Sequence, residues 1–401
     1  QTNPFPFTPP APGGAVDWTL YNALSLSAFS RDYSVPYTYN FNLNVQRAVG
    51  ANIIVQVGYV GSVSHRLASW YEGDPITPAG HAACLANPDC SQSPAQIHLN
   101  FPQYTAQPAV VPGVVPGLPN GLPWYLSIGA QNTEGHSNYN SLQASVIKAP
   151  THGLQFTLGY TYGHALDDGS GYESVTGGSS GYGPAGRVRN YVAGYQYLNY
   201  GSSDFDARHR LVASYVYSVP VFGKARDNAV LRALVAGWGV SGMTALQTGF
   251  PVAVSMGTER SLWCDSYSFF GCPDNPNTSS FNISRFNPRD TPSHSYFDTT
   301  PFSQEELGTF GNTSRNFFHG PGFNYTNLSI TKNILLSGDG RRYVQLRLDG
   351  FNAFNHANFE PPSGSFTSPL FGQVSNVIHS ADPNGDPSPG RSVQLAGKFF
   401  F

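Results

Sequence analysis

Apolar and polar residues alternate strictly along several stretches of this chain. From Tyr37 to Val45 every odd position is apolar or aromatic and every even position is polar. Successive side chains of a strand point to opposite faces of a sheet, so this alternation predicts a strand with one apolar and one polar face. Gly50 marks a tight turn, and the alternation resumes from Ile53 to Tyr59. This stretch therefore predicts a β-hairpin.

The same pattern predicts three further hairpins and one last strand. The hairpins cover residues 142–162, 211–250 and 324–351, and the last strand covers 391–401. In the second of them the connection, at about 221–237, is longer than a tight turn. The chain is thus expected to hold about nine to ten strands of about 10 to 12 residues, the length of a tilted bilayer crossing.

Short and long connections alternate along the chain. The short ones lie near residues 50, 150, 225 and 337, and the long ones at about 62–137, 164–207, 251–323 and 352–390. Soluble sandwiches rarely carry four long structureless loops, whereas outer-membrane barrels have short periplasmic turns and long extracellular loops. The pattern therefore predicts an all-β, antiparallel transmembrane β-barrel over residues 37–401, preceded by an extracellular loop segment over the proline-rich residues 1–36.

Composition agrees with a membrane barrel and argues against two other classes of protein. Charged residues make up 11% of the chain, against about 25% in soluble domains. The net charge of −3 offers no basic field for nucleic acid. No apolar run is long enough for a transmembrane helix, and no signal peptide is expected at Gln1. Aromatic residues, at 14%, suit the interfacial girdles of a barrel.

The four cysteines form two close pairs in segments that read as loops. Cys84 lies near Cys90, and Cys264 lies near Cys272, without the CxxC spacing of zinc sites. Two loop disulfides are expected, which suits an oxidising compartment, and free thiols are the alternative. The histidines are scattered along the chain, so neither a metal site nor a cofactor is expected.

Charged residues gather at the mouths and inner faces of the predicted strands. One interpretation is a polar lumen or ligand track, and the other is an ion-pair network that satisfies charges facing the lumen. The candidates are Arg187, Arg189, Asp204, Asp206, Arg208, Arg210, Arg347 and Asp349.

Catalysis is not expected. Residues Gly177 to Gly181 match the G-x-S-x-G pattern of a nucleophile elbow, which needs a strand before it and a helix after it. Here the match lies in a glycine- and serine-rich loop with neither element predicted.

Several segments taken together resemble one family. They include Asp206-Ala-Arg-His-Arg-Leu211, Gln247-Thr-Gly-Phe-Pro251 and Phe351-Asn-Ala-Phe-Asn-His356. In this order and spacing they resemble the barrel of Oar-like TonB-dependent receptors, which are common in acidobacteria. The resemblance implies a 22-stranded barrel, of which this chain would be roughly the last two-fifths.

The resemblance also implies a function and partners. It implies an outer-membrane receptor that takes up or exports an external ligand, with membrane lipid and the barrel assembly machinery as partners. TonB would act through an N-terminal region, and neither a plug domain nor a TonB box is found here. Phe399 and Phe401 are expected to form the assembly signal, although Ala396 replaces the family's glycine. The alternative is a surface adhesion or structural outer-membrane protein without energised transport.

Overall fold

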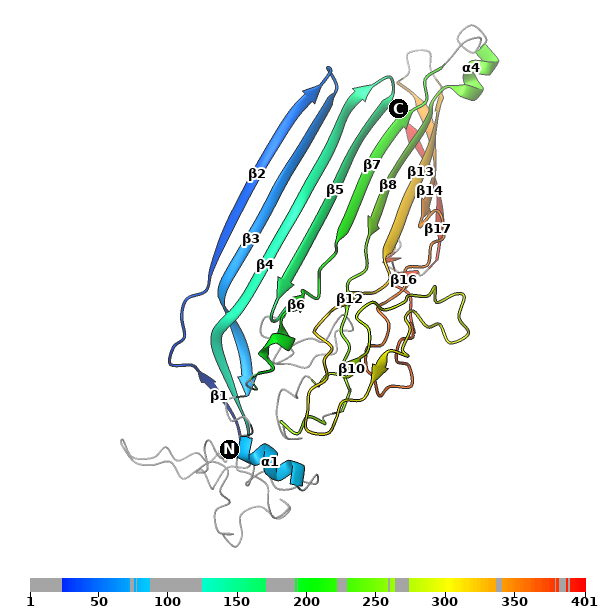
Figure 1. Cartoon of the computed structure of the whole chain (residues 1–401). Helices are drawn as coiled ribbons and strands as arrows, with labels where there is room; N and C mark the ends of the chain where they lie inside the picture. Colours follow the sequence, from blue (N-terminus) through cyan, green and yellow to red (C-terminus); the bar gives the residue numbers. More distant parts are fainter. Residues whose placement is uncertain are drawn as a thin grey trace, which may run out of the picture.

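In the described part of the chain, nine long strands follow one another along an antiparallel sheet in the computed structural model (Figure 1). Each pairs with its neighbours in chain order, so that β2 and β17 form the two edges. This order confirms the predicted antiparallel barrel wall. The strands are β2 (Tyr37–Val49), β3 (Ile53–Glu72), β4 (Tyr125–Thr151), β5 (Leu154–Asp167), β7 (His209–Ser218), β8 (Trp238–Gln247), β13 (Phe323–Leu335), β14 (Tyr343–Phe351) and β17 (Ser392–Phe400).

Shorter elements lie in the connections. The structure describes residues 24–72, 76, 78–86, 125–170, 192, 194–221, 229–258, 260–263, 274–336, 341–378, 380–381, 387–388 and 390–401. The helices are α1 (Pro78–Ala86), η3 (Gln196–Asn199) and α4 (Ala229–Val235), and within these ranges none is long and apolar enough to cross a membrane. The short strands are β1 (Leu24–Phe29), β6 (Gly201–Ser202), β9 (Pro251–Val252), β10 (Asn277–Thr278), β11 (Phe302–Ser303), β12 (Phe318–His319), β15 (Ser380–Ala381) and β16 (Pro387–Ser388).

The register separates apolar and polar side chains onto two faces of the sheet. One row of paired residues runs Leu43, Tyr59, Leu142, Tyr162, and defines the apolar face. A row of opposite parity runs Gln155, Val216, Ser241, Ser329, Asp349 and Gln394, and defines the polar face. The two-residue side-chain period of the sequence therefore becomes a difference between two surfaces.

Apolar side chains of the strands are exposed rather than buried. Leu43 is 69% exposed, Leu142 46% and Leu395 77%. A water-soluble sheet would cover such a face, whereas a barrel wall presents it to lipid. The large exposed apolar face is thus the structural sign of a membrane protein.

The hydrophobic core lies in the long connections and not under the sheet. Residues 251–258, 274–322 and 352–378 pack together around Phe297, which is 1% exposed, with its neighbours Phe302 and Phe318 at ring distances of 5.9 and 5.0 Å. The expectation that these connections are structureless was wrong, because their apolar residues follow no period and only meet in three dimensions. The buried cluster consists of Val252, Val254, Ile283, Tyr296, Phe297, Phe302, Phe318 and Val374.

Two boundaries also differ from the sequence prediction. β3 and β4 pair as far as Glu72 and Gly129, well inside the connection predicted at about 62–137. The register shifts on both sides of Leu67, and such bulges destroy the strict alternation on which the prediction depended. In addition, β1 pairs in parallel with the start of β4, so the segment 1–36 is not loop throughout.

The short turns lie together at one end of the sheet, with the C-terminus, and the long connections lie at the other (Figure 1). Between β4 and β5 the turn is only two residues, His152 and Gly153, both with positive φ. A Cβ atom on Gly153 would come within 2.2 Å of the Ser218 carbonyl oxygen, so this turn requires glycine.

Candidate functional site

Arg315 fastens a long connection to the end of β5. Its buried guanidinium, 6% exposed, donates through Nη1 to Asp167 Oδ1 at 2.6 Å and to the Asn199 carbonyl oxygen at 3.3 Å. Through Nη2 it donates to Asp204 Oδ1 at 3.3 Å and to the Ser170 hydroxyl. A planar guanidinium with several donors suits this convergence of acceptors, which an ammonium group would not satisfy. The connection 274–322 is thereby held at the end of the sheet where the long connections lie.

Asp206 forms a second centre beside the first. The residue is 2% exposed, and its Oδ1 accepts from the Ala165 N–H at 2.8 Å. Its Oδ2 accepts from Arg208 Nε at 2.9 Å and lies 3.1 Å from His319 Nε2 and 3.2 Å from His164 Nδ1. Burial raises the pKa of the Asp206 carboxyl, but hydrogen bonds from His319, the Ala165 N–H and Arg208 outweigh burial and lower this pKa to about 2. Asp206 is therefore a carboxylate at neutral pH.

These two centres lie side by side at the long-connection end of the barrel wall. We call the two together the rim network. It joins the ends of β5 and β7 to β12 and to the residues before it, so it ties sequence-distant segments into one body. Because its buried charges are paired, its architecture favours the ion-pair interpretation of the predicted charged cluster. Its members are Asp167, Asp204, Asp206, Arg208, Arg315 and His319.

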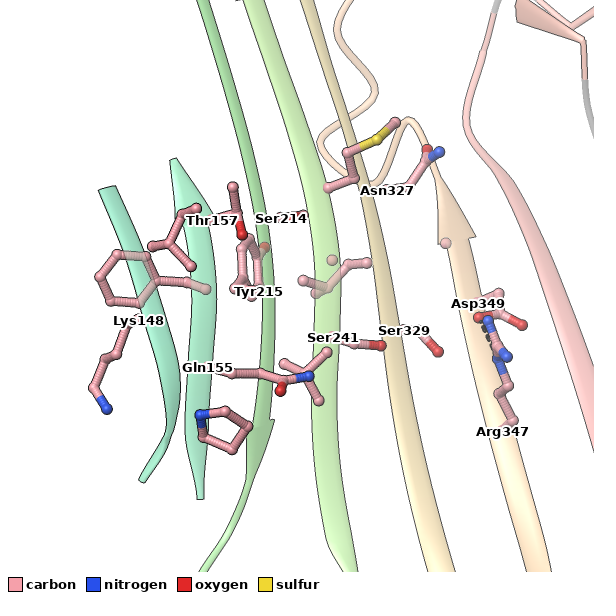
Figure 2. A pocket seen from close by; sticks show the side chains of 18 of the residues that line it. Lys148, Gln155, Thr157, Ser214, Tyr215, Ser241, Asn327, Ser329, Arg347 and Asp349 are labelled. Carbon is pink, nitrogen blue, oxygen red and sulfur yellow. Dashed lines mark hydrogen bonds and ion pairs between the residues drawn. The ribbon is translucent and has the colours of Figure 1, made fainter. Parts of the chain in front are cut away.

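A second polar region lies on the polar face of the sheet, away from the rim network. A cavity of about 640 Å³ is lined there by β4, β5, β7, β8, β13 and β14. Figure 2 shows Ser241 and Ser329 on neighbouring strands, beside a pair formed by Arg347 and Asp349. Arg347 Nε donates to Asp349 Oδ1 at 2.8 Å, and the arginine side chain is 47% exposed. Such a surface suits polar contacts with whatever occupies the barrel interior.

The structure thus divides the predicted site residues into separate groups. Asp204, Asp206 and Arg208 belong to the rim network, and Arg347 and Asp349 line the cavity. Arg210 lies on the polar face of β7, opposite Thr161 and Gln247, and belongs to neither group. Residues Arg187 and Arg189 and the segment 177–181 lie outside the described residues.

Sequence reasoning missed the partners that complete the rim network. Arg315 and Asp167 are 148 residues apart, and His319 and Asp206 are 113 apart, so no local motif joins them. Over the described part of the chain, no group of three or more His, Cys, Asp or Glu residues is arranged to hold a metal ion. The histidines His164 and His319 instead surround one carboxylate.

The cysteine pairs and the terminal phenylalanines remain predictions. Cys84 is fully buried beside Ile76 and is disulfide-bonded, but Cys90, Cys264 and Cys272 lie outside the described residues, so the pairing is untested. Phe399 and Phe401 lie at the end of β17 with their rings stacked 5.9 Å apart, and both are well exposed.

Comparison with known protein families decides the broad class. A family model described as an outer membrane beta barrel domain matches residues 1–394. The chain belongs to this family. The predicted fold class and outer-membrane location are therefore confirmed. No curated protein matches this chain.

Solved structures of two outer-membrane transporters and an outer-membrane receptor also match the chain. The transporter YddB from Escherichia coli is 10% identical, with a TM-score of 0.42 over 94% of this chain and 34% of that one. The FrpB iron transporter from Neisseria meningitidis is 9% identical, with a TM-score of 0.38 over 94% and 33%. The pyoverdine receptor FpvA from Pseudomonas aeruginosa is 10% identical, with a TM-score of 0.36 over 91% and 30%. The chain spans about a third of the length of these proteins.

Proposed function

We propose that this chain forms part of the barrel wall of an Oar-like TonB-dependent receptor, which passes a ligand across the outer membrane. The observation that carries the proposal is the two-faced sheet, with exposed leucines on one face and, on the other, a cavity whose lining includes Gln155, Ser241, Ser329, Arg347 and Asp349. In a complete barrel the polar face lines the lumen, where a plug or a passing ligand meets it. The long connections then lie outside the cell, and the short turns lie in the periplasm.

The two polar regions have different roles in this proposal. The rim network holds the connection 274–322 in one arrangement over the mouth, because its charges are already paired within the protein. The Arg347 guanidinium uses Nε for Asp349, and in this proposal its terminal nitrogens bind an anionic or carbonyl group of the ligand. The external ligand therefore meets the barrel at Arg347 and Asp349 rather than at Asp206.

The partners follow from the same proposal. TonB acts on a plug domain encoded upstream, and the barrel assembly machinery recognises the terminal strand with Phe399 and Phe401. Loop disulfides that join Cys84 to Cys90 and Cys264 to Cys272 complete the extracellular surface.

The deciding experiment measures the native protein. It is extracted from outer membranes, run on a gel with and without heating, and passed over the immobilised periplasmic domain of TonB. A heat-modifiable species well above the 43.2 kDa of this chain that binds TonB supports the receptor. A heat-modifiable species of about 43.2 kDa that does not bind TonB supports the structural or adhesive alternative. A soluble species without a heat shift overturns the barrel assignment.

A paired labelling experiment tests the two faces. Gln345→Cys and Leu346→Cys are neighbours in β14, on the polar and apolar faces respectively. In native membranes a water-soluble maleimide should label the first and spare the second. Equal labelling of both would contradict a lipid-covered wall.

A further inference from the structure

The connection between β7 and β8 carries a short helix whose apolar side chains point away from the protein. α4 has the sequence AVLRALV. Val230 is 70% exposed, Leu231 40%, Leu234 64% and Val235 37%. Positions i, i+1, i+4 and i+5 lie on one side of a helix, so these four form one continuous apolar stripe.

The stripe has a fixed orientation relative to the sheet. Lys332 Nζ donates to the carbonyl oxygens of Leu234 at 3.0 Å and Ala236 at 2.5 Å. Trp238 Nε1 also donates to the Leu234 carbonyl oxygen, at 2.8 Å. The helix ends before Gly237, whose φ of +77° reverses the chain into β8. Three hydrogen bonds from two side chains, together with the glycine stop, therefore hold α4 at the start of β8.

The C-terminal end of α4 lies against the apolar face of the barrel wall. Lys332 pairs with Trp238 on one side and with Leu346 on the other, and all three side chains share the apolar face. Trp238 is 41% exposed, and the Lys332 ammonium lies 5.1 Å from the centre of its ring. A tryptophan and a lysine with its stem on an apolar surface are typical of the membrane–water boundary. α4 lies at the same end as the short turns (Figure 1).

We propose that α4 lies in the inner leaflet of the outer membrane, with its apolar stripe inserted among phospholipid acyl chains. The inner-leaflet assignment rests on the proposed orientation, with the short turns in the periplasm. A seven-residue helix is not stable by itself in water, so its apolar side needs a cover. Lipid supplies that cover where the apolar face ends, and Arg232, which lies off the stripe, stays at the headgroups. The β7–β8 connection thus anchors the wall instead of extending into the periplasm.

The test compares two positions of the same helix. Leu234→Cys lies on the stripe and Arg232→Cys lies off it, and each is labelled with an environment-sensitive fluorophore. The protein, isolated whole from the outer membrane, is reconstituted in phosphatidylethanolamine–phosphatidylglycerol vesicles, with the unmutated protein as labelling background. Brominated acyl chains should quench the label at Leu234 several-fold more than the label at Arg232, and aqueous iodide should show the reverse order.

A third label separates failure of this proposal from failure of the barrel assignment. Leu43→Cys lies on the apolar face of β2, far from α4, and must be quenched by brominated lipid if the sheet spans the bilayer. Lipid quenching at Leu43 with iodide quenching at Leu234 overturns the anchor alone. Iodide quenching at both positions overturns membrane insertion and the proposed function with it. Heat-modifiable gel migration of every variant confirms that it has folded.

Discussion

Replacing Arg315 by methionine is the sharpest test of the rim network. The substitution keeps an unbranched chain of similar length but removes the cation that pairs with Asp167, whose side chain is 5% exposed. The Asp167 carboxylate then stays buried without its partner. Breaking a buried pair in this way costs about 3–5 kcal/mol. The cost falls on docking of the connection 274–322, because Arg315 belongs to that segment.

Hydrogen exchange of the membrane-extracted protein measures this docking. Each 1.4 kcal/mol corresponds to about a tenfold change in an equilibrium constant, so the amides around Arg315 should exchange at least about 100-fold faster. In Arg315→Lys the exchange rate should lie between those of the unmutated protein and Arg315→Met, because an ammonium keeps the charge but not the planar set of donors. Adding Asp167→Asn to Arg315→Met should recover part of the loss, because the stranded charge is removed.

The Arg347 variant serves as the matched control. Arg347→Met removes an arginine whose side chain is half exposed, and such pairs contribute at most about 1 kcal/mol. It should leave exchange around Arg315 unchanged. The reasoning fails if Arg315→Met changes that exchange less than about tenfold, or if Asp167→Asn makes the double variant worse.

Three further predictions concern pH and backbone. Asp206 has a pKa of about 2, below its ordinary 3.8. Its stabilisation of the rim network is therefore complete above pH 3.8 and is lost as the pH falls through about 2. Asp206→Asn should abolish this pH dependence when it is measured by hydrogen exchange. Burial raises the pKa of Glu305. The connection 274–322 should therefore be most stable below pH 4.5 and lose stability as the pH rises through the pKa that Glu305 has in the folded protein. Glu305→Gln should stabilise this connection at pH 8, and a less stable variant would refute the prediction. Gly237→Ala places a Cβ 2.3 Å from the Asn333 carbonyl oxygen at a φ of +77°, so it should lower the thermal unfolding midpoint, while the roomier Gly159→Ala should not.

Strand periodicity is what the sequence determined most completely. The hairpin of β2 and β3 was predicted from alternation alone, because a barrel wall has a different solvent on each face and every residue must match one of them. The same reasoning located the other long strands and the exposed apolar face. It failed beyond Ser64, where register shifts interrupt the alternation although the strands go on pairing.

Only the tertiary structure decided how the long connections fold. The phenylalanines Phe297, Phe302 and Phe318 have no period in the sequence, and they form a core because the segments 274–322 and 352–378 meet in space. Likewise Arg315 finds Asp167 across 148 residues. Each residue of a strand faces one side of the sheet or the other, so alternation along the sequence is enough to specify its environment. A buried ion pair or an aromatic cluster depends on which distant segments are brought together, and a local pattern carries no record of that.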